Sequence, residues 1–148
     1  MRIILFILIA FSFFASQGQK KPVLSKLSKL KTFLGKNENG AIVPVDEALQ
    51  LINFPLRIVD ADNERCMLIS YHLMYKRKSF FEDETTGKKE VAFSQVGDLF
   101  KETPLPLMWR KIMSESLKKD EELFFYDIII KDKQGRRRFA PELKIKIQ

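Results

Sequence analysis

Apolar and polar residues alternate along much of the chain after residue 55, which is the pattern of β-strands with one buried face. In the longest such stretch, 66–76, the odd-numbered residues from Met67 to Tyr75 are all apolar and are expected to face the core. A nearly unbroken run of β-branched and aromatic residues follows later and predicts a central strand covered on both faces. Strands are predicted over 56–60, 66–76, 90–96, 123–130 and 136–147, the last two forming a C-terminal β-hairpin.

Three other stretches have apolar residues at helical spacing. Thr103 and Pro104 suit a helix N-terminus, and the apolar stripe that follows predicts an amphipathic helix over 104–118, packed on the sheet. A short helix is predicted over 47–53, and a third apolar stripe predicts helix over 22–34.

These elements predict a mainly β (α+β) fold, namely an antiparallel β-sandwich-like domain with one packed amphipathic helix and a C-terminal β-hairpin. With 148 residues, the chain is long enough for one domain. The domain is placed at residues 54–148, and residues 19–53 are interpreted as a Lys-rich leader with short helical segments.

The N-terminus has the pattern of a secretory signal peptide. Met1 and Arg2 precede a 12-residue apolar run, 3–14, which is short for a transmembrane helix. Ser16 and Gly18 give the small residues that signal peptidase accepts, so residues 1–18 are predicted to be removed. The mature protein is expected in the periplasm, or extracellular at the cell surface.

The net charge of +7 is concentrated near the N-terminus. Six lysines and no acidic residue lie within 20–36, whereas residues 37–148 contain 19 basic and 19 acidic side chains. Because the main domain is neutral, nucleic acid is not expected as a partner. The Lys-rich segment 20–36 is a candidate for peripheral contact with an anionic membrane or an acidic polymer.

The residue types argue against an enzyme. The chain has one His, His72, and one Cys, Cys66, so it cannot form an internal disulfide or a multi-ligand His/Cys zinc site. The acids at 60, 62 and 64 have the spacing of a calcium loop but lack its Gly and final Glu. No catalytic residue, metal site or cofactor is therefore predicted.

Two polar segments are candidate partner contacts. Phe80 and Phe81 lie within the charged segment 76–89, which is interpreted as an exposed hairpin connection, where one ring is expected to tuck into the core. Arg136, Arg137 and Arg138 follow a turn, where they either bind a carboxylate-rich partner or keep a strand edge soluble.

The C-terminal sequence LFFYDIIIKDKQGRRRFAPELKIKI resembles the C-terminal domain of the GldM type of gliding-motility and type IX secretion proteins of Bacteroidetes. Two features depart from that pattern: Lys119-Asp120 replaces the usual Gly before the penultimate strand, and the long N-terminal parts of GldM are missing. The resemblance implies a stand-alone exported β-rich module that docks other envelope proteins. The matching residues are Phe124, Tyr126, Asp127, Ile128, Lys131, Asp132, Gly135, Arg136, Arg138, Lys146 and Ile147.

The expected function is that of an exported, non-catalytic binding or assembly module of the cell envelope, with an envelope protein as partner. A soluble secreted ligand-binding or inhibitor protein acting through Phe80 and Phe81 is the first alternative. A small hydrolase that uses His72 is the second.

Overall fold

The computed structural model describes residues 29–148, so the predicted signal peptide (1–18) and residues 19–28 of the predicted leader lie outside it. The described part is mainly β, as predicted, with two helices. In chain order the elements are β1 (Lys31–Leu34), β2 (Ala41–Val43), α1 (Val45–Leu51), β3 (Leu56–Val59), β4 (Met67–Glu82), β5 (Lys89–Phe100), α2 (Leu107–Ser116), β6 (Glu122–Lys131), β7 (Arg137–Phe139) and β8 (Leu143–Ile147).

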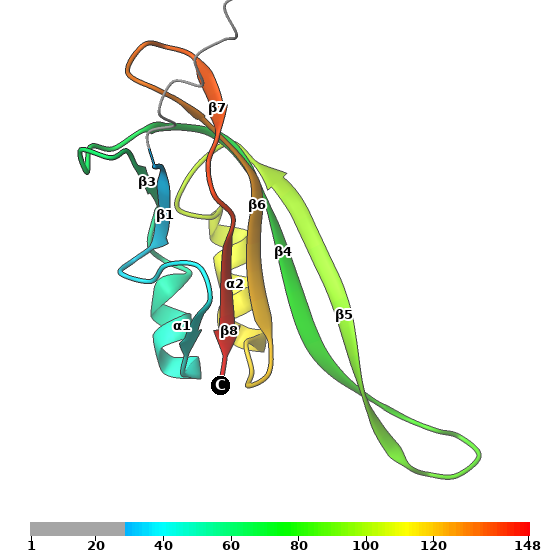
Figure 1. Ribbon diagram of the computed structural model, residues 1–148. Helices are drawn as coiled ribbons and strands as arrows, with labels where there is room; N and C mark the ends of the chain where they lie inside the picture. The colour runs from blue at the N-terminus through cyan, green and yellow to red at the C-terminus, as the bar shows by residue number, and fades with distance from the viewer. Residues whose placement is uncertain (1–28) are drawn as a thin grey trace, which may run out of the picture.

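Six strands form one sheet in the order β2-β8-β6-β4-β5, and β7 pairs with the far end of β6 (Figure 1). β4 and β6 are central and run antiparallel to their neighbours, while β2 lies parallel to β8 at one edge. The predicted central strand and C-terminal hairpin are confirmed, although the returning strand is broken at Pro141, which has no N–H to donate. The prediction that the central strand is covered on both faces is wrong, because its second face is only half-buried and Asp127 there is exposed.

One face of this sheet carries the hydrophobic core. Tyr71, Leu73 and Tyr75 of β4 are at most 1% exposed. The two-stranded ribbon of β1 and β3 and both helices supply the second layer, with residues such as Leu51 and Met113 in the same cluster. On the opposite face of the sheet, the alternate residues of β6 are half-buried.

The predicted start of the domain at residue 54 is wrong. Leu34, Val43 and Leu51 lie in the same core cluster as the main sheet, so the domain includes at least residues 30–52. The predicted helix over 22–34 is also wrong for its last four residues, which form β1. Pairing with β3 satisfies their backbone groups, and the alternation of Thr32 and Leu34 buries one face.

The predicted strand at 66–76 is confirmed but is longer, because β4 runs from Met67 to Glu82. Its odd-numbered residues do not all face the core. The register with β6 shifts around Ser70, so Met67 is 67% exposed while Ser70 is buried. A β-bulge of this kind reverses which alternate set faces inward.

The predicted amphipathic helix exists, but it begins at Leu107. Thr103 does not cap it, because its hydroxyl accepts a hydrogen bond from the Leu56 N–H at 2.6 Å. Met113 is fully buried, whereas Met108 and Ile112, which belong to the apolar stripe of the predicted helix, are 73% and 47% exposed. The buried part of the helix is therefore narrower than its apolar stripe.

Candidate functional site

A β-hairpin arm extends from one end of the sheet. β4 pairs with β6 as far as Lys76, but it continues to pair with β5 as far as Glu82. Residues 77–94, here called the arm, therefore have only each other as strand neighbours, and Figure 1 shows them projecting beyond the body of the domain. The segment 76–89, predicted to be an exposed hairpin connection, does join the two strands of a hairpin, but it forms strand for most of its length because each half pairs with the other strand.

The arm exposes apolar side chains on both faces. Phe80 and Phe81 are 60% and 50% exposed, so the prediction that one ring tucks into the core is wrong. As successive strand residues they point to opposite faces. Val91 pairs with Phe80 and Phe93 pairs with Lys78, so these two residues share the face of Phe80. Sequence analysis missed Val91 and Phe93 as surface residues, because their alternation is equally typical of a buried strand.

Two lysines lie against rings on this face. Lys76 Nζ is 4.7 Å from the centroid of the Phe93 ring, and Lys78 Nζ is 5.8 Å from the centroid of the Phe80 ring. These are cation–π distances. The face therefore combines exposed aromatic area with positive charge, as protein-binding surfaces often do.

A buried carboxylate holds the base of the arm. Glu121, just before β6, is 2% exposed. Its carboxylate accepts hydrogen bonds from the Tyr75 hydroxyl, from the Lys78 N–H at 2.9 Å and from the Lys118 N–H at 2.9 Å. Burial, and then the hydrogen bond to this carboxylate, raise the pKa of Tyr75 well above its usual value.

The Lys78 N–H has no hydrogen-bond acceptor in β6, because the last β4–β6 pair is Lys76 with Glu122. Glu121 takes the place of the missing strand neighbour. Beside it, Lys78 Nζ lies 2.5 Å from Asp120 Oδ2. Nothing in the sequence distinguishes Glu121 from its acidic neighbours Asp120 and Glu122.

The tip of the arm is a hydrogen-bonded turn at 83–88. Asp83 Oδ1 accepts hydrogen bonds from the N–H groups of Thr85 at 2.9 Å and Thr86 at 2.8 Å. These two hydrogen bonds lower the pKa of the Asp83 carboxyl, and the bond from the Thr86 N–H has the larger effect. Gly87 has a φ of 63°, a left-handed conformation that glycine adopts without strain.

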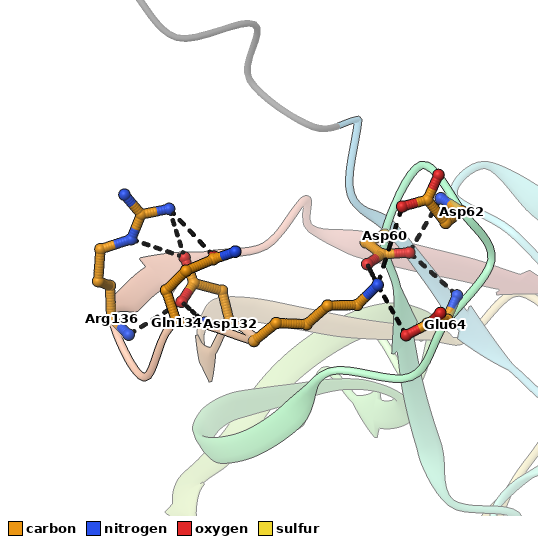
Figure 2. Close-up of polar contacts among 7 residues, drawn as sticks. Asp60, Asp62, Glu64, Asp132, Gln134 and Arg136 are labelled. Carbon is orange, nitrogen blue, oxygen red and sulfur yellow. Dashed lines mark hydrogen bonds and ion pairs between the residues drawn. The ribbon is translucent and has the colours of Figure 1, made fainter.

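The three predicted arginine contacts lie at the opposite end of the domain, near β7 (Figure 1). Arg136 is held within its own turn, with Nε 3.0 Å from Asp132 Oδ2 and Nη2 3.3 Å from Gln134 Oε1 (Figure 2). Arg137 and Arg138 are successive residues of β7 and point to opposite faces. The three guanidinium groups therefore do not converge, and the structure does not bring them near Phe80 and Phe81.

The acidic loop at 60–64 lies beside this turn (Figure 2). Asp60 Oδ1 accepts hydrogen bonds from the N–H groups of Asp62 and Glu64, and the Glu64 N–H is the main cause of the lowered pKa of Asp60. Lys133 Nζ lies 2.7 Å from Glu64 Oε2 and 3.2 Å from Asp60 Oδ2. The Lys133 ammonium group thus lies where a calcium ion would bind these carboxylates. Within residues 29–148, no group of three or more His, Cys, Asp or Glu side chains is arranged to hold a metal ion.

His72 lies on the uncovered face of the sheet, in a stack of rings. Its ring stacks on Tyr126 with the centroids 5.1 Å apart, and Tyr126 stacks on Phe124 at 5.2 Å. His72 Nδ1 is 3.7 Å from Asp127 Oδ2 and has no hydrogen-bond partner in the described part of the chain. Cys66 is half-buried, and burial raises the pKa of its thiol.

In general terms, the protein is a mainly β domain with a projecting hairpin that carries exposed aromatic residues. No protein-family model matches the chain, and no curated protein matches it. Neither helix described in residues 29–148 has the length and apolar character needed to cross a membrane.

Proposed function

We propose that this protein is an exported, non-catalytic binding or assembly module of the cell envelope, and that its arm docks a partner protein. The observation that carries the proposal is the arm itself. It extends the two strands past the sheet, and it exposes Phe80, Phe81 and Phe93 without burying them in the domain.

The arm offers a partner both backbone and side-chain contacts. β5 is an edge strand of the described sheet, and its outer N–H and C=O groups are available to an added strand. Aromatic residues are enriched at the energetic centres of protein interfaces because each buries a large apolar area. A partner strand along β5 would also cover the ring of Phe93 and the side chain of Val91.

The envelope setting rests on the signal-peptide pattern of residues 1–18 and on the resemblance to the GldM type. Two backbone conformations are compatible with that resemblance. Asp127, at the Asp/Asn position of the pattern, has a φ of 47°, and Asp120, at the place of the usual Gly, has a φ of 71°. Gly, Asn and Asp are the residues that adopt this left-handed region most readily.

Photo-cross-linking in the native envelope tests the proposal. A benzoylphenylalanine replaces Phe81 in the arm or, as the matched control, Phe139 of β7, which is 71% exposed at the opposite end. We expect the arm probe to capture an envelope protein in fixed ratio and the control probe to capture none. The double substitution Phe80→Ala with Phe81→Ala should prevent co-purification, while His72→Ala should not.

The outcome also separates the proposal from its first alternative. If the protein is recovered alone from a soluble fraction and the arm probe captures no envelope protein, the assembly function is refuted. Capture of a soluble secreted protein by the same probe would instead favour the ligand-binding or inhibitor function.

A further inference from the structure

A cavity lies on the side of the domain formed by α1 and the β1–β3 ribbon. It has a volume of about 730 Å³, within the range of small-molecule sites. Its apolar lining includes Leu51 and Phe54. Gly35 also lines it, and a Cβ at that residue would lie 2.8 Å from Leu51 Cδ2, so the absence of a side chain there keeps this part of the wall open.

Two arginines line the cavity without an anionic partner. Arg57 Nε is buried and has no hydrogen-bond acceptor, and no oxygen of residues 29–148 pairs with the guanidinium groups of Arg57 or Arg65. Leaving a buried donor of a charged group unsatisfied is costly. The Arg57 guanidinium instead lies over an aromatic ring, with its Cζ 5.1 Å from the centre of the Phe33 ring.

The other charged residues of the lining set the charge of a fitting ligand. Lys36 Nζ lies 3.6 Å from Glu47 Oε1, so these two residues largely neutralise each other. Asp46 offsets one of the two arginines, which leaves a net charge of about +1 by this count of formal charges. A single negative charge matches that excess better than a doubly charged phosphate does.

We propose that this cavity binds an apolar molecule that carries one carboxylate, with Arg57 as the main contact to the carboxylate and Arg65 as the second. The planar guanidinium of arginine pairs with a carboxylate through two parallel hydrogen bonds. The apolar part of the ligand lies against Leu51 and Phe54. The site is separate from the arm and adds a small-ligand function to the proposed docking function.

Titration of the purified protein with octanoate, followed by NMR, tests the site. We expect the amide signals of Gly35, Leu51 and Phe54 to shift in a saturable manner, whereas octylamine, which has the same chain and the opposite charge, should not shift them. Arg57→Gln should weaken octanoate binding about tenfold or more, as expected for the loss of a charged hydrogen-bonded pair. Arg137→Gln, a charge-matched substitution in β7, should leave the affinity unchanged.

The source of the carboxylate is addressed by a second probe, an acetylated dipeptide ending in Phe, used as the free acid and as the amide. Tighter binding of the peptide acid than of octanoate would identify a peptide C-terminus as the ligand, and the reverse would identify a free apolar acid. If Arg57→Gln does not fold, Arg65→Gln and Phe54→Ala serve as replacements and should also weaken binding. Absence of saturable shifts with both acids, equal binding of octylamine, or unchanged affinity in these variants would overturn the proposal.

Discussion

The substitution Glu121→Gln tests whether the buried carboxylate holds the base of the arm. The carboxylate accepts three hydrogen bonds with its two oxygens, and the residue is 2% exposed. The amide of Gln presents an NH₂ group in place of one oxygen. In the less damaging orientation, this group faces the Lys78 N–H, which loses its acceptor, while the bonds from Tyr75 and Lys118 become bonds to a neutral group.

The expected cost follows from these losses. One buried N–H without an acceptor costs about 1–3 kcal/mol, and two hydrogen bonds weaken from the charged to the neutral range. Relief of carboxylate burial offsets part of this, so we expect the free energy of unfolding to fall by about 3 kcal/mol. For a domain of this size, that corresponds to a decrease in Tm on the order of 10 °C.

Urea denaturation gives the free energy of unfolding, and amide hydrogen exchange at Lys78 gives the local effect. The matched control is Glu122→Gln, which removes a charge next to Glu121 but breaks only the 3.6 Å ion pair with Lys144, so it should cost less than about 1 kcal/mol. A loss below about 0.5 kcal/mol in Glu121→Gln, or equal losses in the two variants, would refute the assigned role of this carboxylate.

Three further outcomes are expected. Gly97→Ala should destabilise the protein by about 2–3 kcal/mol in urea denaturation, because its Cβ would lie 2.5 Å from the Leu73 carbonyl oxygen. The control Gly40→Ala should cost only about 1 kcal/mol for its φ of +85°, because nothing lies within 4 Å of the added Cβ. Equal costs in the two variants would contradict the steric reason. The pKa of Asp83, measured by NMR, should lie below 3.8, so its stabilising contribution to the tip of the arm is present at neutral pH and is lost as the pH falls through that lowered pKa. Asp83→Asn should abolish this pH dependence, and a pKa at or above 3.8 would argue against the hydrogen-bonded turn. Cys66 should react with a thiol reagent at pH 8 more slowly than an unfolded control peptide, because burial raises its pKa, and equal rates would contradict that.

The alternation of apolar residues was sufficient to predict most of the sheet, because burial of one face imposes a period of two on any strand. It failed at Ser70, since a β-bulge reverses the alternation and no residue type marks it. It also failed for the arm. A strand exposed on both faces needs no apolar alternation, so the charged residues from Lys76 to Lys89 have the composition of a loop.

The candidate site was predicted only in part, for a related reason. Phe80 and Phe81 were evident as aromatic residues in a charged segment, but their exposure depends on how far β4 and β5 extend past β6. The roles of Glu121 and Arg57 depend on residues distant in the sequence, Tyr75 and Phe33. Spacing along the chain carries no information about such partners.

The arm is difficult to explain as a simple connection between β4 and β5. Two residues are enough to join antiparallel strands, and an isolated two-stranded hairpin adds little stability in water. The arm instead orders residues 77–94 beyond the sheet, at a cost in conformational entropy, and exposes Phe80 and Phe81. The fold also places the charge of Glu121 in its interior to hold the arm, and burying a carboxylate is unfavourable unless its hydrogen bonds are satisfied. Within the isolated domain, little buried apolar area offsets the entropy cost of ordering the arm, and the proposed partner would supply that area by covering Phe80 and Phe81.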